Sequence, residues 1–239
     1  MKRMSKYKVI LFDVDDTLIC NESSADSRFE LIFEKIFRDY GVSSIKYTEL
    51  INKNRIWYFK NEDQKLSPTY ARNLFWQKIL KELNISLSIK KQKEIVDLYW
   101  QKCLEGIKLK SNVDKVLSTL KDHRYKLGIL SNGDFYSKAC KLTHLKVDKY
   151  FSYLFTTELV GKNKFSTDIY KYAIETLNIN PEDIMMVGDT IEQDVVPANK
   201  VSINTVLISK SDQLDYKGRK YSKPDFKIKT LDAILKIVS

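Results

Sequence analysis

Two acidic residues at the end of an apolar segment are the first indication of chemistry in this sequence. Residues 7–12 form an apolar, β-prone run, and Asp13 and Asp15 follow it directly. Residues two apart in an extended segment lie on the same side, so both carboxylates are expected to reach one place. Single aspartates at strand ends are often turn or helix N-cap residues, and Asp16 and Asp134 fit that interpretation. Asp13 and Asp15, in contrast, are better explained as residues that take part in a reaction.

Polar residues also follow two later apolar segments, and a lysine lies in the loop after a third. These residues are Ser131, Asn132, Asp189, Asp194 and Lys164. If the segments are parallel strands, their carboxyl ends meet at one edge of a sheet, where ligands of such folds bind. Carboxylates, a hydroxyl and an ammonium would converge there, and Ser131 and Lys164 could hold phosphoryl oxygens. Clustered carboxylates are costly without a cation, and oxygen ligands favour Mg²⁺.

Two of these residues also have a simpler explanation when each is considered alone. Ser131 fits a helix N-cap, and Lys164 fits a solvated surface lysine. Their shared sheet edge and their order along the chain favour the phosphoryl-transfer interpretation, for which an anion needs both a hydroxyl and a fixed cation.

The segments that position these residues alternate in character after Lys110. Alternating strands and helices predict right-handed βαβ units in a doubly wound, Rossmann-like parallel sheet, an α/β fold. The predicted strands are 7–12, 126–130, 153–156, 184–187 and 204–208, and the predicted helices are 113–121, 136–145, 167–177, 194–200 and 231–238.

The segment between the first two strands has helical periodicity instead. We expect an all-helical cap domain inserted after the first strand, so that residues 1–20 and 105–239 form the α/β core and residues 21–104 form the cap. The predicted cap helices are 25–40, 47–59, 68–83 and 89–104, with breaks at Gly41, 66–67 and 84–87.

Composition agrees with a globular protein of 239 residues, with 43% hydrophobic and 30% charged residues. No stretch approaches the roughly 20 apolar residues of a membrane helix, and the basic start of the chain does not resemble a secretion signal. The three cysteines, Cys20, Cys103 and Cys140, are far apart, which predicts a reducing, cytoplasmic location without disulfides. The net charge of +10 comes from dispersed lysines without a nucleic-acid motif, so we expect no nucleic-acid polymer and no membrane as partner. The oligomeric state is not indicated.

Four motifs in this order resemble those of the haloacid-dehalogenase-like (HAD) superfamily, in its phosphatase branch. Residues 13–18 are similar to its first motif, Asp-x-Asp-x-Thr, and Ser131 to its second. Lys164 falls at the third motif, and residues 187–190 with Asp194 are similar to the fourth. The resemblance covers nearly the whole chain and includes a helical cap in the usual place.

The resemblance implies a Mg²⁺-dependent phosphatase that hydrolyses a small phosphate monoester through an aspartyl-phosphate. It implies that Asp13 is the nucleophile and that Asp15 protonates the leaving oxygen and then activates water. Asp13, the backbone carbonyl of Asp15, and Asp189 would bind the metal. Ser131 and Lys164 would hold the transferring group.

Asn132 and Asp194 would support this set from outside the reacting groups. The chain departs from the family pattern at Phe165, where proline is usual, and at Pro197 and Ser202, where glycines are common. These departures concern loop geometry rather than the reacting groups.

Several other functions remain compatible with the motifs. The family's dehalogenases lack an acid at the position of Asp15, because a halide leaves without a proton. Sugar phosphomutases share the four motifs, phosphonatases use a cap lysine, and a noncatalytic phosphate-ligand binding protein is also conceivable. A receiver-type signalling module is disfavoured, because there the phosphorylated aspartate ends the third strand.

The predicted cap contains two segments rich in aromatic and basic residues, 52–59 and 71–76. They look similar to the cap of the family's nucleotide monophosphatases and could stack a base. Helix packing explains the same residues, since an amphipathic helix needs an apolar stripe. A nucleoside monophosphate, a sugar phosphate and other small phosphate esters therefore all remain candidates.

Overall fold

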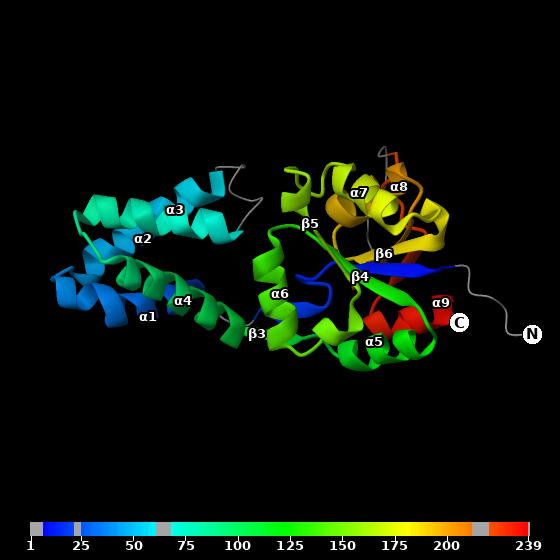
Figure 1. The fold of residues 1–239 in the computed structure, drawn as a ribbon, viewed down its shortest axis with the longest axis horizontal. Coiled ribbons are helices and arrows are strands. Elements are labelled where there is room, and N and C mark those ends of the chain that lie inside the picture. The colour runs from blue at the N-terminus through cyan, green and yellow to red at the C-terminus, as the bar shows by residue number, and fades with distance from the viewer. Residues whose placement is uncertain (1–6, 22–24, 61–67, 212–219, 239) are drawn as a thin grey trace, which may run out of the picture. The chain divides into compact units, whose positions relative to one another are not determined.

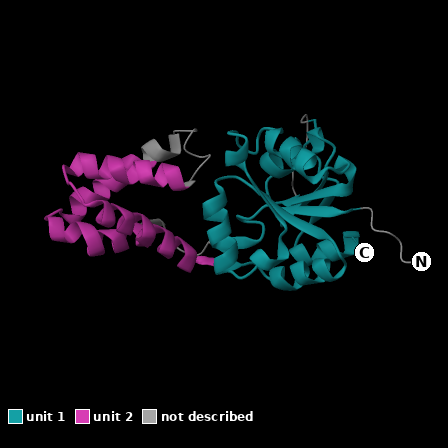
Figure 2. Ribbon diagram, viewed as in Figure 1, with its two compact units in different colours: residues 1–20, 108–239 teal, residues 21–107 magenta. Residues whose placement is uncertain are grey.

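The computed structural model of this chain describes residues 7–21, 25–60, 68–211 and 220–238. The chain divides into two compact units, an α/β unit of residues 1–20 and 108–239 and a helical unit of residues 21–107 (Figure 2). The strands are β1 (Val9–Phe12), β2 (Ile19–Asn21), β3 (Ile107–Leu109), β4 (Lys126–Ser131), β5 (Tyr153–Thr156), β6 (Ile184–Gly188), β7 (Asn204–Ile208) and β8 (Phe226–Ile228).

The α-helices fall in both units. They are α1 (Ala25–Ile32), α2 (Ser44–Lys60), α3 (Pro68–Leu83), α4 (Ile89–Glu105), α5 (Val113–Asp122), α6 (Phe135–His144), α7 (Asp168–Leu177), α8 (Val196–Lys200) and α9 (Leu235–Val238). Among the residues that the structure describes, no helix combines the length and the apolar character needed to cross a bilayer.

The α/β unit is built on a six-stranded sheet in the order β5-β4-β1-β6-β7-β8, with every neighbouring pair parallel. All four residues of β1 are buried, as expected for a central strand covered on both faces. Figure 1 shows α5 and α9 on one face of the sheet and α7 and α8 on the other. The predicted doubly wound α/β fold is confirmed.

The sheet register brings three strand ends to the same level. Phe12 of β1 pairs with Ile129 of β4 on one side and with Val187 of β6 on the other. The direction of strand order reverses between β1 and β6, because the chain runs outward through β4 and β5 before it crosses back. Ligands of open α/β sheets bind at such a switch point, so the segments that follow β1, β4 and β6 meet there.

Several elements differ from the sequence prediction. The short strands β2, β3 and β8 were not predicted, because three-residue segments with charged or amide residues carry no clear alternation. The predicted helix 25–40 is α1 followed by a π-helical turn and a 3₁₀ turn. The predicted helix 194–200 begins earlier, as a π-helical turn at Ile191, and 231–238 begins as a 3₁₀ turn before α9. The predicted break at 66–67 lies outside the described residues.

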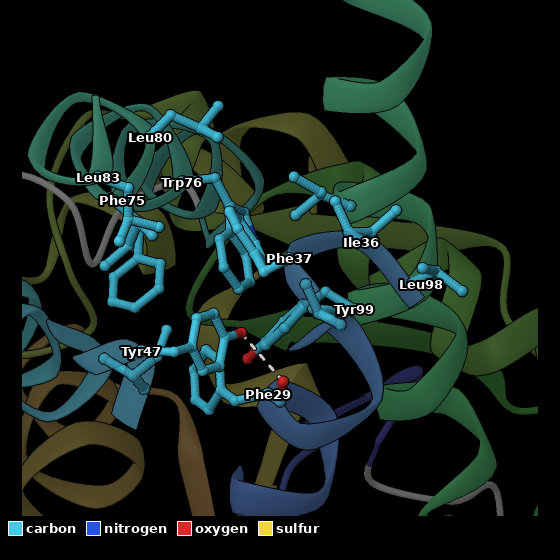
Figure 3. Packing of buried hydrophobic residues seen from close by; sticks show 14 of the residues in the cluster. Phe29, Ile36, Phe37, Tyr47, Phe75, Trp76, Leu80, Leu83, Leu98 and Tyr99 are labelled. Carbon is cyan, nitrogen blue, oxygen red and sulfur yellow. Dashed lines mark hydrogen bonds between the residues drawn. The ribbon is translucent and has the colours of Figure 1, made fainter. Parts of the chain in front are cut away.

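The helical unit encloses its own apolar core, which is rich in aromatic rings (Figure 3). Phe29 of α1 lies with its ring centroid 5.6 Å from that of Phe75 and 5.8 Å from that of Trp76, both on α3. The buried hydroxyl of Tyr47 donates to the Phe29 carbonyl at 3.0 Å. Helix packing thus accounts for Phe75 and Trp76, whose role as a base-stacking surface was the alternative. The side chains of residues 56–59 lie outside the described ones.

Candidate active site

A pocket of about 210 Å³ opens where β1, β4 and β6 end. It brings together all the residues that the sequence predicted for the site, namely Asp13, Asp15, Ser131, Asn132, Lys164, Asp189 and Asp194. Every one of them belongs to the α/β unit. Strand ends and the loops after them supply these side chains, in agreement with the position of ligand sites in open parallel sheets.

Asp13 occupies the centre of this arrangement. Its backbone N–H donates to the Val187 carbonyl at 2.9 Å, which extends the pairing of β1 with β6 by one residue. The carboxylate oxygen Oδ1 accepts a hydrogen bond from Ser131 Oγ at 3.1 Å and from Lys164 Nζ at 2.8 Å. Two donors on one oxygen fix the orientation of the carboxylate. The Ser131 hydroxyl therefore contacts Asp13, and the N-cap of the following helix is Asp134 instead.

Lys164 is almost completely buried, with 1% of its side chain exposed. Its ammonium forms ion pairs with Asp13 and with Asp194 Oδ1. Burial alone would lower the pKa of Lys164, but these two carboxylates outweigh it and raise the pKa well above its usual value. The side chain is thus a fixed cation and not a solvated surface lysine.

Asp194 is the second anchor of this lysine. Its Oδ2 accepts a hydrogen bond from the Thr190 backbone N–H at 2.9 Å. Burial raises the pKa of Asp194 to about 6, although the ammonium of Lys164 opposes this shift. The Asp194 side chain packs directly against the backbone of Gly188 at the end of β6. A side chain at that position would prevent this contact, because its Cβ would lie 2.2 Å from Asp194 Cγ.

Asn132 connects two loops of the site. Its Oδ1 accepts a hydrogen bond from the Lys164 backbone N–H at 2.9 Å, and its Nδ2 donates to Gln193 Oε1 at 2.5 Å. The amide therefore holds the loop that carries Lys164 against the segment that leads to Asp194. Phe165, where the family pattern has proline, lies next to Lys164 with 56% of its surface exposed, so this departure does not displace the lysine.

Asp15 has two cationic partners that the sequence did not reveal. Its carboxylate forms ion pairs with Lys138 and Lys141, both on α6. Burial would raise the pKa of Asp15, but the two ammonium groups outweigh it and hold the pKa well below its usual range. Lysines three apart on a helix are normally on a solvated face, and only the packing of α6 reveals otherwise. In the sequence, the one indication that Lys138 and Lys141 lie near the site is their position on the helix that follows Ser131.

Asp134 caps the N-terminus of α6, which confirms the sequence prediction that it is a turn or N-cap residue. Asp134 Oδ1 accepts a hydrogen bond from the Ser137 backbone N–H at 2.7 Å, an N-cap contact. Asp16 lies in a turn with a positive φ of 58° and is exposed. These two aspartates therefore serve local structure.

The oxygen atoms near Asp13 fit a magnesium ion. Burial raises the pKa of Asp189, and the Asp13 carboxylate raises it further, while Thr17 Oγ1 donates to Asp189 Oδ1 at 3.1 Å. Two carboxylates that disfavour each other's charge are relieved by a divalent cation. Across the described residues, no three or more His, Cys, Asp and Glu side chains are grouped to hold a metal. A backbone carbonyl and water would complete an oxygen shell, as Mg²⁺ prefers.

Comparison with known proteins places the chain in a family. The sequence profile of the haloacid dehalogenase-like hydrolases matches residues 7–201. This chain therefore belongs to the haloacid dehalogenase-like hydrolases. A glyceraldehyde 3-phosphate phosphatase of Pyrococcus furiosus is 26% identical to it over 242 aligned positions, which cover 98% of this chain and 94% of the relative.

Solved structures of the same family share the fold. A HAD phosphatase from Thermococcus onnurineus matches with a TM-score of 0.66 and 25% identity, covering 97% of this chain and 98% of the other. A 2-haloacid dehalogenase from Pseudomonas syringae pv. Tomato DC3000 matches with a TM-score of 0.76 and 17% identity, covering 97% of each chain. Because a dehalogenase also has this fold, the reaction has to be inferred from the site.

Proposed function

We propose that this chain is a Mg²⁺-dependent phosphatase that hydrolyses a small phosphate monoester through a phosphoaspartate at Asp13. The supporting observation is the Asp13 carboxylate itself, held inside the pocket by Ser131 Oγ and Lys164 Nζ. The same hydroxyl and ammonium are suited to hold a phosphoryl group as it moves to the aspartate. Family membership and the phosphatase relative support the same enzyme class, a phosphoric monoester hydrolase.

The reaction takes two displacements at phosphorus. In the first, Asp13 Oδ2, which neither donor contacts, forms a bond to phosphorus while the ester bond to the leaving oxygen breaks. Asp15 gives that oxygen a proton. In the second, Asp15 takes a proton from water, the water oxygen attacks phosphorus, and the bond to Asp13 breaks. Inorganic phosphate and the original carboxylate result.

The contacts of Asp15 support its role in this sequence. The ammonium groups of Lys138 and Lys141 favour its ionised form, which is the form that accepts a proton from water. In the first step Asp15 has to be in its acid form. The substrate therefore has to replace part of the contact with the two lysines, and Asp15 takes up a proton from solvent as the substrate binds. An acid two residues after the nucleophile also favours an ester over a carbon–halogen bond, because an alkoxide needs a proton to leave.

Asp13, the Asp15 carbonyl and Asp189 are the groups that would hold Mg²⁺. When bound, the ion would supply positive charge that offsets the negative charge of the phosphoryl oxygens and of the two carboxylates. Lys164 remains a cation in the absence of metal, because Asp13 and Asp194 stabilise its charge. Lys164 and the metal therefore make separate electrostatic contributions.

Hydrolysis of p-nitrophenyl phosphate tests this proposal. We expect release of p-nitrophenol with Mg²⁺, loss of release with EDTA, and recovery when Mg²⁺ is added back. Asp13→Asn keeps the shape of the side chain and removes the nucleophile, so turnover should be lost. Asp122→Asn makes the same change at an exposed position of α5 and is the matched control. Wild-type turnover by Asp13→Asn would overturn the proposal.

A further inference from the structure

The contact between Asp15 and α6 contains an excess of positive charge. Lys138 and Lys141 each form an ion pair with the one Asp15 carboxylate. Lys138 has only 6% of its side chain exposed and Lys141 19%, whereas 43% of the Asp15 side chain is exposed. Burying a cation is costly unless an anion accompanies it. Two largely buried ammonium groups that face one carboxylate therefore leave one positive charge that a second anion could balance, and the partly exposed Asp15 carboxylate is the group through which solvent reaches this contact.

These ammonium groups lie on the leaving-group side of the reaction. If Asp15 protonates the leaving oxygen, that oxygen lies within about 2.6–3.2 Å of the Asp15 carboxylate. Both lysines are within hydrogen-bond distance of the same carboxylate. The leaving oxygen is then at most about 6 Å from the ammonium nitrogen that contacts the same carboxylate oxygen, and at most about 8 Å from the other, because Lys138 contacts Oδ2 and Lys141 contacts Oδ1. In the proposed mechanism, Ser131 and Lys164 hold the transferring phosphoryl group, so Lys138 and Lys141 are not needed for that role.

We propose that Lys138 and Lys141 form a subsite for a second anionic group, a carboxylate or a phosphate, carried by the leaving group of the substrate. This inference rests on the proposed function and names its substrate class. An anionic group one or two carbon atoms from the leaving oxygen extends about 3–4 Å from it, and with a hydrogen bond of about 3 Å it reaches the nearer of the two ammonium groups. In the free protein, the Asp15 carboxylate contacts both ammonium groups, and the anion of the substrate would take over part of these contacts.

The local structure keeps this subsite rigid. The two lysines are three residues apart, so they lie on the same face of α6. Asp134 caps the first turn of that helix through the Ser137 backbone N–H at 2.7 Å. Rigid presentation of two cations favours binding of an anion, because less side-chain freedom is lost than with two exposed lysines.

A pair of near-isosteric esters tests the subsite. 2-Phosphoglycolate and 2-hydroxyethyl phosphate differ in a carboxylate against a hydroxymethyl group, and ethylene glycol bisphosphate replaces the carboxylate by a second phosphate. We expect the wild-type protein to have the higher kcat/KM for one or both of the doubly anionic esters. In Lys138→Met and Lys141→Met, this preference should fall by on the order of 10- to 100-fold, as expected for the loss of one charge-assisted hydrogen bond. If the lysine substitutions lower the preference for 2-phosphoglycolate, the anion is a carboxylate. If they lower the preference for ethylene glycol bisphosphate, it is a phosphate.

A control variant and a replacement variant separate a specific effect from a loss of net charge or of fold. Lys115→Met removes an exposed lysine from α5 and should leave the preference between esters unchanged. If Lys138→Met fails to fold, as judged by circular dichroism and thermal melting, Lys141→Gln takes its place, because the Lys141 side chain is more exposed.

Binding to the Asp13→Asn protein separates this inference from the proposed function. Calorimetry with the same three esters needs no turnover. Tighter binding of a doubly anionic ester, lost on adding Lys138→Met or Lys141→Gln, supports the subsite whether or not the wild-type protein turns over p-nitrophenyl phosphate. Failure of the p-nitrophenyl phosphate assay would count against the proposed function alone. Equal binding of all three esters, or a preference that survives both lysine substitutions, would overturn the subsite.

Discussion

Gly188→Ala tests whether the position of Lys164 depends on the close approach of Asp194 to β6. The added Cβ would lie 2.2 Å from Asp194 Cγ and 2.3 Å from its Oδ2. Non-bonded carbon atoms normally lie about 3.5–4.0 Å apart, so Asp194 has to move by about 1 Å or more. Asp194 is 2% exposed and has no open space in which to do so without loosening its ion pair with Lys164.

The expected cost follows from the burial of this ion pair. Removing one partner of a buried pair costs about 3–5 kcal/mol, and displacing Asp194 should reach the lower end, about 3 kcal/mol. For a chain of this length, that corresponds to a fall in Tm of roughly 6–12 °C. Because Lys164 also contacts Asp13, kcat/KM for p-nitrophenyl phosphate should fall as well, by on the order of tenfold or more.

Thermal melting and steady-state kinetics measure both effects. Gly41→Ala is the control for an added methyl group without a clash, since nothing lies within 4 Å of a Cβ at Gly41. Unlike Gly188, Gly41 has a positive φ, 69°. The Gly41→Ala substitution should cost only the backbone strain of about 1–2 kcal/mol and leave kcat/KM unchanged. Adding Asp194→Ala to Gly188→Ala removes the clash, so the two costs should not add. A Gly188→Ala protein that melts like Gly41→Ala with full activity would refute the reasoning.

Two further substitutions test local contacts by thermal melting. Tyr47→Phe removes the buried hydrogen bond to the Phe29 carbonyl and should lower stability by about 1 kcal/mol; an unchanged Tm would mean that the contact contributes nothing. Asp134→Ala removes the N-cap of α6, its contact with the Ser137 N–H, and should cost about 1–2 kcal/mol. Asp122→Ala, at an exposed position, should cost less, and equal losses for both aspartates would contradict the capping role.

The strands at the centre of the sheet were predictable because they are buried on both faces. β1 is a continuous apolar run, and such runs stand out in a sequence. β2 and β3 pair with each other although the helices α1 to α4 separate them in the sequence. Their three-residue sequences contain asparagine and lysine. Their pairing is set by long-range contacts that local patterns do not encode.

The site was predictable to the extent that its residues follow strands. Asp13, Ser131 and Asp189 each come directly after an apolar run, and the sheet order then brings them together. Lys138 and Lys141 escaped prediction because their type and spacing are typical of a solvated helix face. Their burial depends on how α6 packs beside the segment after β1, which only the three-dimensional structure reveals.

Chemical trapping at Asp13 tests the central claim, that this carboxylate becomes phosphorylated. The wild-type protein would be mixed with Mg²⁺ and p-nitrophenyl phosphate, quenched during the first turnovers, treated with borohydride and digested. Borohydride reduces an aspartyl-phosphate to homoserine, which mass spectrometry of the peptides locates. We expect homoserine at position 13, absent without substrate and absent in Asp13→Asn. Homoserine at another aspartate, or an unmodified Asp13 in protein that is releasing p-nitrophenol, would contradict the proposed mechanism.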